Sequence, residues 1–307
     1  MDTFNYSKDF QKMIVCLHRA KENWPNYQNY LKAHLGGPDS RVVIFTKYLC
    51  PEIEYHCGSL KDKRILDFGC GTGATTAALA QNSKQICAFD TDEESIEICK
   101  RRISEHGLKS RVQFYCADDL DKVKDFMDTF DLILVNGVIE HIPLTRTGLR
   151  KKTMQSLFEL LKKPGYLYIN ETPNRLYPFD FHTTQLWWIP WTKPGSEWAY
   201  RKAVKKGRHS DAPTISKGSL GLEERGAWGA TYWEIKNYLK GEKIVCTNTV
   251  SGHNRHIHYL SSPLGKFLGT WKQTVFEFIM YYSAVKLLHI PITAFAPNIT
   301  NLVIKKC

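Results

Sequence analysis

A glycine-rich turn that follows an acidic residue is the part of this 307-residue chain best suited to binding a small ligand. An apolar run, residues 64–68, predicts a strand that passes directly into Asp67-Phe-Gly-Cys-Gly-Thr-Gly73. Glycines at a strand-to-helix turn let the backbone approach a ligand where a Cβ would be in the way. We therefore expect a ligand to bind against the turn between Asp67 and Gly73.

Two classes of ligand compete for this turn. Gly69, Gly71 and Ala74 satisfy the dinucleotide pattern G-x-G-x-x-G/A, and Asp90 ends the next predicted strand, where a ribose-binding acid belongs. Asp67 favours the other class, because a carboxylate before the first glycine suits an ammonium or sulfonium ligand and does not suit a pyrophosphate. A nicotinamide dinucleotide remains the alternative.

Residues 170–184 could act on a second substrate. They are dense in Glu, Asn, Arg, Asp and His, and they leave the carboxyl end of a predicted strand, where α/β proteins place ligands. His182 is the expected general base because imidazole titrates near neutrality, and Asp180 or Glu171 could orient it or share the proton transfer. A loop whose His and Asp bond only to backbone fits the sequence equally well.

Four side chains are candidates for binding this second substrate, the acceptor: Asn174, Arg175, Trp187 and Trp188. The arginine could pair with a phosphate or carboxylate of the acceptor, or with Glu171 in a structural bridge. The tryptophans could form an aromatic wall for a sugar, an aryl ring or a lipid, or belong to the core of an inserted cap.

Short apolar runs alternating with helical stretches must position these residues. Strands are predicted over 64–68, 85–90, 112–116, 130–136 and 165–171, with helices over 74–81, 93–106, 120–127 and 150–162 between them. This alternation predicts a parallel sheet with right-handed crossovers. A helix over 230–239 and strands over 243–249 and 299–305 complete a Rossmann-like, doubly wound, seven-stranded α/β fold.

Four sequence elements in order resemble the class I S-adenosylmethionine-dependent methyltransferases. They are Asp67-x-Gly-x-Gly-x-Gly73, Asp90 after the second strand, Ala117-Asp-Asp119 after the third, and residues 130–142 across the fourth. The resemblance covers roughly residues 61–172 and the tail strands. It implies S-adenosylmethionine as the cofactor.

The resemblance also implies a role for each matching position. The turn from Gly69 to Gly73, Cys70 and Gly71 included, would pack against the amino acid part of the cofactor, and Asp67 would hold its ammonium. Asp90, with Thr91 beside it, would bond the ribose. The remaining cofactor residues are Asp118 and its neighbour Asp119 at the adenine, and Asn136 at the methionine part. Capping a helix is the more conventional role for Asp119.

Residues 137–141 resemble the E-x-x-E-H stretch of ubiquinone-pathway-type O-methyltransferases, whose acidic residues and histidine can hold a metal. Gly137 stands where the first Glu of that motif would be. Glu140 and His141 are then too few for a metal site, so we expect no metal and a structural or cofactor-pocket role for both.

The domain organisation follows as one sheet domain interrupted by two insertions. The predicted parts are an N-terminal helical segment (1–60), a cofactor-binding core (61–173), an acceptor-binding insertion (174–229), a core helix and strand (230–250), a second insertion (251–297) and the last core strand (298–307). Residues 275–288 are too apolar for a helix that faces water on all sides, so they should pack on the cap or lie against a membrane or a partner subunit.

Composition and charge set the remaining limits. The chain is 43% hydrophobic and 24% charged, which is ordinary globular usage and excludes disorder. Its net charge is +11, and almost all of the excess lies in residues 174–307, with 18 Lys+Arg against 8 Asp+Glu. An anionic partner is therefore expected. Nine cysteines without a C-x-x-C pair, and the lack of a signal or spanning segment, predict a reduced, cytoplasmic protein.

The function expected from these observations is methyl transfer, most simply to oxygen of a small-molecule or sugar/glycan-like, possibly phosphorylated, acceptor. Two alternatives are an RNA methyltransferase, suggested by the basic C-terminal half, and an NAD-dependent oxidoreductase. Nucleic acid is the less favoured partner because the tryptophans cluster and do not alternate with basic residues. A binding module without turnover, peripheral membrane contact and any oligomeric state remain open.

Overall fold

A seven-stranded sheet forms the centre of the structure, a computed structural model that describes residues 5–18, 27–83, 85–118, 120, 125, 128–208, 217–241, 243–244, 279 and 281–307. Its order is β3-β2-β1-β4-β5-β9-β7. The strands are β1 (Arg64–Phe68), β2 (Gln85–Asp90), β3 (Val112–Cys116), β4 (Phe130–Asn136), β5 (Leu161–Asn170), β7 (Lys243–Ile244) and β9 (Leu302–Lys306). The predicted doubly wound sheet is confirmed, although only two residues of β7 are described.

The first five strands of the sheet run parallel, and β9 is antiparallel to both β5 and β7. The chain moves outward from β1 through β2 to β3 and then returns to place β4 on the other side of β1. Ligands bind at such a reversal of strand order, outside the carboxyl ends of the strands. Asp67 is the penultimate residue of β1 and Asn136 is the last residue of β4, the two strands that border it, and Asp90 ends the neighbouring β2.

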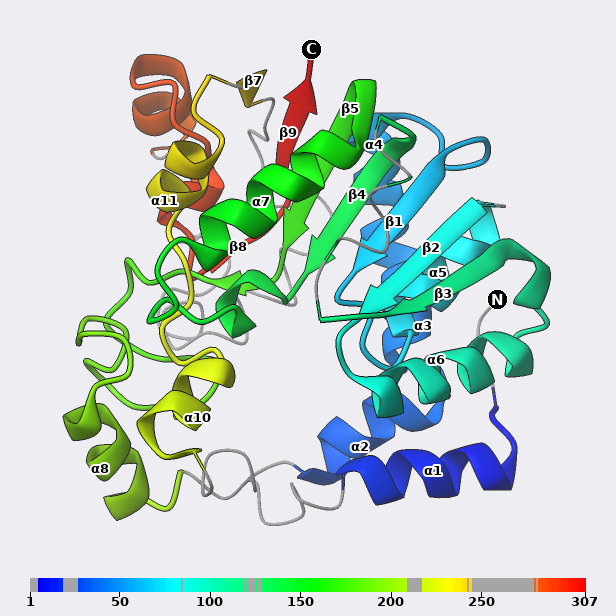
Figure 1. Cartoon of the computed structure of the whole chain (residues 1–307), viewed down its shortest axis with the longest axis horizontal. Coiled ribbons are helices and arrows are strands. Elements are labelled where there is room, and N and C mark those ends of the chain that lie inside the picture. Colours follow the sequence, from blue (N-terminus) through cyan, green and yellow to red (C-terminus); the bar gives the residue numbers. More distant parts are fainter. Residues whose placement is uncertain are drawn as a thin grey trace.

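Helices cover both faces of the sheet (Figure 1). On one face α5 (Ala74–Asn82) and α6 (Glu93–Glu105) pack with the continuous helical run α3 (Arg41–Ile44), η2 (Phe45–Leu49) and α4 (Cys50–Cys57). The small residues of α5 are almost all buried, because the helix lies between the sheet and that run. On the other face α7 (Leu149–Leu160) and α11 (Tyr232–Tyr238) cover β4 and β5.

Two further groups of helices extend beyond the carboxyl ends of the parallel strands (Figure 1). At the N-terminus α1 (Lys8–His18) and α2 (Tyr27–Leu35) bury Phe10 and Leu31 against Ile98 of α6. The insertion after β5 forms a separate small core through α8 (Glu197–Lys205) and α10 (Ser219–Glu224). Both groups therefore flank the edge of the sheet where the candidate residues lie.

Several predicted boundaries differ from the structure. β5 begins at Leu161, so residues 161–164 belong to a strand and not to the end of the preceding helix. The sequence analysis did not predict the short antiparallel pair β6 (Thr172–Pro173) and β8 (Asn298–Ile299). Most of the helix predicted over 120–127 lies outside the described residues, as does most of the strand predicted over 243–249.

The described part of the apolar segment 275–288 is the π-helical turn η6 (Tyr281–Leu287) with its flanks. Ala284 is buried, but Ile279, Tyr282, Leu287 and Leu288 are all more than half exposed. The segment is therefore not covered by the cap over its described length. No helix among the described residues is long and apolar enough to cross a bilayer. The eight cysteines that the structure describes are all free.

Candidate active site

The glycine turn after β1 adopts a backbone that side chains would disturb. Gly69, Gly71 and Gly73 all have positive φ angles, of 73°, 50° and 80°. A Cβ on Gly69 would come within 2.5 Å of Val138, and one on Gly73 would collide with Cys99 of α6. A Cβ on Gly71 would meet nothing within 4 Å. The turn is thus packed on its inner side and open at Gly71, where a ligand can approach the backbone.

Asp67 lies beneath this turn and is 1% exposed. Its Oδ2 accepts a hydrogen bond of 2.7 Å from the hydroxyl of Thr76 on α5. Burial raises the pKa of this carboxyl to about 7, against the lowering effect of the Thr76 bond. A cationic ligand placed beside Asp67 would favour the ionised form and would itself be stabilised by it.

Asp90 holds the turn from the end of β2. Its Oδ2 accepts the backbone N–H of Gly71 at 2.7 Å, and its Oδ1 accepts that of Asp92 at 3.0 Å. Asp92 in turn caps α6 by accepting the N–H of Ser95. Burial raises the pKa of Asp90 while these backbone bonds lower it. The carboxylate is therefore fixed at the strand end, next to the open side of the turn.

The other predicted cofactor residues fall into three groups. The side chain of Cys70 is buried in the core, which leaves only its backbone for a cofactor. Thr91 and Asp118 are exposed beyond the ends of β2 and β3, where the resemblance expects ribose and adenine. Asp119 lies outside the described residues.

Asn136 connects three elements at the end of β4. Its amide donates to Thr75 Oγ1 of α5 at 3.3 Å, and its Oδ1 accepts from the amide of Asn170 of β5 at 2.9 Å. The Oδ1 of Asn170 accepts the backbone N–H of Asn301 at 3.2 Å. This hydrogen-bonded chain sets the position of the β4 end relative to the glycine turn.

A cluster of one carboxylate and two imidazoles lies just beyond Asn136. Glu140 and His141 come from the short η5 turn (Ile139–His141) after β4, and His182 comes from the loop after β6. The Nε2 atoms of His141 and His182 lie 4.0 and 3.9 Å from Glu140 Oε1, and the two rings meet edge to face at 5.2 Å. The structure thus brings the predicted general base to the two residues of the incomplete E-x-x-E-H motif.

The C-terminal end of α10 orients both imidazoles. The Nδ1 of His141 lies 2.8 Å from the carbonyl oxygen of Glu224, and the Nδ1 of His182 lies 3.1 Å from that of Arg225. A carbonyl can only accept, so Nδ1 carries the proton in both rings and Nε2 is the basic nitrogen in the neutral form. The last carbonyls of a helix are available for such bonds because they lack intrahelical donors.

Close backbone packing at Gly226 completes the cluster. Its φ is +88°, and a Cβ there would come within 2.8 Å of Glu140 Cγ and 3.2 Å of His182 Nδ1. Arg150 fixes the η5 turn by donating to the carbonyls of Ile142 and Glu140. Sequence analysis missed these supporting groups, because Gly226 and the Glu224 and Arg225 carbonyls carry no pattern that links them to Glu140.

Glu140 is the most perturbed acid of this cluster. Its side chain is fully buried, and neither carboxylate oxygen has a hydrogen-bond partner within 3.5 Å among the described residues. Burial raises its pKa to about 8 and outweighs the lowering effects of its own backbone N–H, the Arg150 charge and the Thr172 hydroxyl. A buried carboxyl with a raised pKa that faces two imidazoles is typical of a functional site.

Asp180 holds the backbone of the loop that carries His182, and its role in orienting the imidazole ring stays a prediction. Its buried carboxylate accepts the backbone N–H groups of His182, Thr183 and Thr184 and the hydroxyl of Thr184, at 2.7–3.0 Å. It therefore holds the loop backbone in place. One contact that orients the imidazole ring is the one between its Nδ1 and the carbonyl oxygen of Arg225. Glu171 lies 3.9 Å from Arg41, which links it to the helical run before β1.

Two of the predicted acceptor-binding residues have structural roles. The amide of buried Asn174 donates to the carbonyls of Ala294 and Ala296, and its Oδ1 accepts from the backbone N–H of Leu176, so its contact with the acceptor stays a prediction. Arg175 forms an ion pair with Glu234 of α11, and not with Glu171 as the structural alternative supposed.

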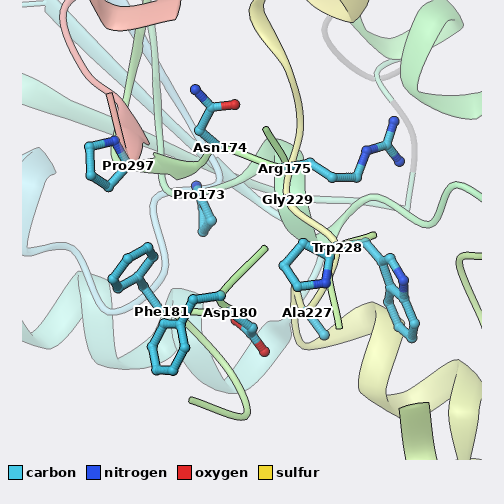
Figure 2. A pocket seen from close by; sticks show the side chains of 11 residues that line it. Pro173, Asn174, Arg175, Asp180, Phe181, Ala227, Trp228, Gly229 and Pro297 are labelled. Atoms are coloured by element: carbon cyan, nitrogen blue, oxygen red, sulfur yellow. The ribbon is translucent and has the colours of Figure 1, made fainter. Parts of the chain in front are cut away.

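The pocket next to these residues is small (Figure 2). It leaves only about 10 Å³ of space, room for about a single water molecule. An acceptor could not enter it in this conformation. Trp187 and Trp188 do not line it: they are 54% and 51% exposed. A larger hollow, of about 300 Å³, lies by Arg64, Gln85 and Val112, at the opposite end of the sheet from the glycine turn.

The E-x-x-E-H resemblance implies a metal site, and Glu140, His141 and His182 together fit one better than the two motif residues alone. The prediction of no metal counted two ligands, whereas the ligand atoms of Glu140, His141 and His182 all lie within 4.8 Å of one another. The unpartnered buried carboxylate is a further sign of fit. Two imidazoles and one carboxylate suit a transition metal such as Zn²⁺ or Fe²⁺ better than Mg²⁺, which prefers oxygen ligands.

Comparison with known proteins agrees with this geometry. Residues 59–187 match the family described as "Methyltransferase domain". The chain is 26% identical over 235 residues to a "Ubiquinone biosynthesis O-methyltransferase" of Coxiella burnetii, covering 74% of this chain and 88% of that protein. It is 30% identical over 172 residues to the protein of the same name from Haemophilus ducreyi, covering 55% of this chain and 66% of that one.

Solved structures match part of the chain at low similarity. A SAM-dependent O-methyltransferase of Thermotoga maritima matches with a TM-score of 0.33 and 19% identity, over 44% of this chain and 51% of that chain. A phosphoethanolamine N-methyltransferase of Haemonchus contortus matches with a TM-score of 0.37 and 15% identity, over 54% and 33%. Scores this low do not discriminate between acceptors. The sequence matches, together with the sheet order and the turn that follows Asp67, make this chain a class I S-adenosylmethionine-dependent methyltransferase.

Proposed function

We propose that this enzyme methylates a hydroxyl oxygen of a small acceptor, with the cluster of Glu140, His141 and His182 receiving the hydroxyl proton. One observation carries the proposal. The Nε2 atoms of His141 and His182 lie 3.9–4.0 Å from the buried carboxylate of Glu140, in the turn that follows the end of β4. The relatives named O-methyltransferase support oxygen as the accepting atom.

The chemistry needs alignment and a proton acceptor. The acceptor oxygen attacks the sulfonium methyl carbon in line, the O–C bond forms, and the S–C bond breaks with its electron pair remaining on sulfur. The hydroxyl proton passes to Nε2 of His182, whose Nδ1–H is held by the Arg225 carbonyl. The products are the methyl ether, S-adenosylhomocysteine and an imidazolium that returns its proton to water.

In an alternative to this proton transfer, Glu140, His141 and His182 would hold a divalent metal, which when bound would lower the pKa of an acceptor hydroxyl. Nε2 of His182 would then be a ligand and would no longer accept the proton. The chain's own contribution is to orient these three side chains through α10, Gly226 and Arg150. The excess of basic residues after residue 174 further supports an anionic or phosphorylated acceptor.

The first prediction concerns His182. A mass-shift screen over catechols, phenols, sugars and sugar phosphates would identify an acceptor, and His182→Ala should then lower kcat by about 10²–10³-fold. Affinity for S-adenosylhomocysteine, measured by calorimetry, should stay near normal because His182 lies outside the glycine turn. An unchanged kcat in His182→Ala would remove this residue from the mechanism.

A further inference from the structure

Four of the eight tryptophans of the chain are exposed on the insertion after β6. Trp187, Trp188, Trp191 and Trp198 are between 51% and 58% exposed. Trp228 of the same insertion shows the contrast: it is 1% exposed, and its indole N–H donates to the carbonyl of Thr192. Clustered exposed tryptophans on a folded surface mark an interaction site.

The four exposed rings form one surface, which we call the tryptophan face. The ring of Trp188 lies 6.2 Å from that of Trp187 and 5.4 Å from that of Trp191. Lys202 of α8 joins the fourth ring to them, because its Nζ donates to the carbonyl of Trp187 at 2.7 Å and lies 4.7 Å from the ring centre of Trp198.

The tryptophan face lies over the small hydrophobic core of the insertion. Ile189, Ala199 and Ala203 are buried beneath it in the small core of the insertion. Trp188 has a φ of +74°, a strained conformation for a bulky residue, and its N–H donates to the carbonyl of Pro178. The backbone therefore holds a large apolar ring toward solvent at a conformational cost.

The charges around the tryptophan face are strongly positive. Residues 186–208 contain six Lys+Arg and one acidic residue, Glu197, which pairs with Arg201. Lys205 and Lys206 are exposed at the end of α8. Indole rings favour the interface between water and lipid, and lysines near a bilayer surface are attracted to anionic headgroups.

From this combination we propose that the tryptophan face docks the enzyme on the surface of an anionic lipid bilayer. Single-stranded nucleic acid also binds aromatic and basic residues, but it needs ring faces open for stacking. Here adjacent rings are tilted at 47° and 59° at contact distance, so the rings partly cover one another. Docking would let the enzyme meet acceptors that partition into lipid.

Vesicle binding tests the proposal. The full-length protein is mixed with vesicles of phosphatidylcholine, or of phosphatidylcholine and phosphatidylglycerol in equal parts, and the bound fraction is measured by flotation. We expect binding to the anionic vesicles that falls with salt. Trp191→Ala with Trp198→Ala, and separately Lys205→Glu with Lys206→Glu, should each reduce it about tenfold or more.

Matched controls keep the result interpretable. Trp233→Ala removes an exposed tryptophan of α11, and Lys151→Glu with Lys152→Glu reverses two exposed charges of α7, both outside the tryptophan face. All variants should keep S-adenosylhomocysteine affinity and the wild-type melting temperature. Equal losses in test and control variants would overturn the proposal. So would binding to a uridine oligonucleotide, or self-association, in place of vesicle binding. No acceptor is needed, so failure here leaves the methyl-transfer proposal standing.

Discussion

At the scale of single residues, burial raises the pKa values of two carboxyls, Asp67 and Glu140, to near neutrality. Asp67 belongs to the cofactor turn and has a pKa of about 7, and Glu140 belongs to the histidine cluster and has a pKa of about 8. Burial is the first cause in both cases. Because these pKa values lie near neutrality, the ionisation of each carboxyl can be followed between pH 5 and 8.

For Glu140 the predicted effect is on stability. Its pKa is raised from 4.5 to about 8, so the folded protein holds a proton that the unfolded chain releases between these values. The free energy of unfolding should therefore fall as pH rises from 5 to 8, with a contribution on the order of a few kcal/mol. Glu140→Gln removes the titration and should flatten that fall.

Urea unfolding at pH 5 and 8, with a chelator present, measures this contribution. The chelator matters because a bound metal would hold Glu140 ionised and oppose the effect. Equal losses of unfolding free energy in the wild type and in Glu140→Gln between the two pH values would contradict the assignment.

For Asp67 the predicted effect is on cofactor binding. The ionised carboxylate attracts the ammonium of the cofactor, and raising pH from 6 to 8 ionises a group whose pKa is about 7. Affinity for S-adenosylhomocysteine should increase by up to about tenfold over that range. Calorimetry at the two pH values should show a much smaller change in Asp67→Asn, and an undiminished change there would assign the dependence to another group.

Sequence could predict the positions of residues that lie at a strand end. Asp67, Asp90 and Asn136 stand at the expected edge because parallel strands bring their carboxyl ends to one edge of the sheet. Sequence could not predict the hydrogen bonds of Asp180 and Asn174, since their polar atoms bond to backbone groups that only the folded loop brings near. The partnership of Glu140 with His182 spans two elements, and no spacing rule connects them.

At the scale of elements, two glycines of the turn between β1 and α5 have different roles: Gly73 is needed for packing, and Gly71 faces the open side where a ligand can bind. Gly73→Ala would drive a methyl group into Cys99 of α6 from a backbone with φ of +80°, whereas Gly71→Ala meets open space at φ of +50°. Gly73→Ala should cost about 2–4 kcal/mol of unfolding free energy, and Gly71→Ala about 1 kcal/mol.

Binding should show the reverse order. Gly71→Ala places its methyl group where the cofactor is expected to approach, so it should weaken S-adenosylhomocysteine binding in protein that remains folded. Thermal melts and calorimetry on the two variants separate these effects. A larger stability loss in Gly71→Ala than in Gly73→Ala would mean that the turn is packed differently.

The alternation of strands and helices was predictable because each strand is an apolar run bounded by a helix with its own stop signal. The start of β5 was not, because Lys162, Lys163 and Pro164 read as a helix end but lie within β5, between Leu161 and the residues that pair regularly with β4. The pair β6 and β8 has two residues in each strand and leaves no periodic pattern in the sequence. Tertiary contacts alone specify it.

At the scale of the whole molecule, one buried cation ties the N-terminal helices to the cofactor turn. Arg102 of α6 is 1% exposed, and its Nε donates to the carbonyl of Thr72 within the glycine turn at 2.7 Å. Its other nitrogens reach Tyr6 and the carbonyl of His34, and its guanidinium lies about 5 Å from the rings of Tyr6 and Phe10. Arg102 therefore joins Tyr6, 96 positions earlier in the chain, to the glycine turn.

Arg102→Met should consequently loosen the N-terminal segment and the cofactor turn together. Removing one partner of such a buried network costs about 3–5 kcal/mol, because the Thr72 and His34 carbonyls lose a charged donor. Relative to the wild type, hydrogen exchange should become faster in α1 and not in β1. Calorimetry should show weaker S-adenosylhomocysteine binding. Lys100→Met, an exposed change on the same helix, should leave both unchanged. Full protection of α1 in Arg102→Met would mean that the apolar contacts of Phe10 and Ile14 hold α1 without the cation.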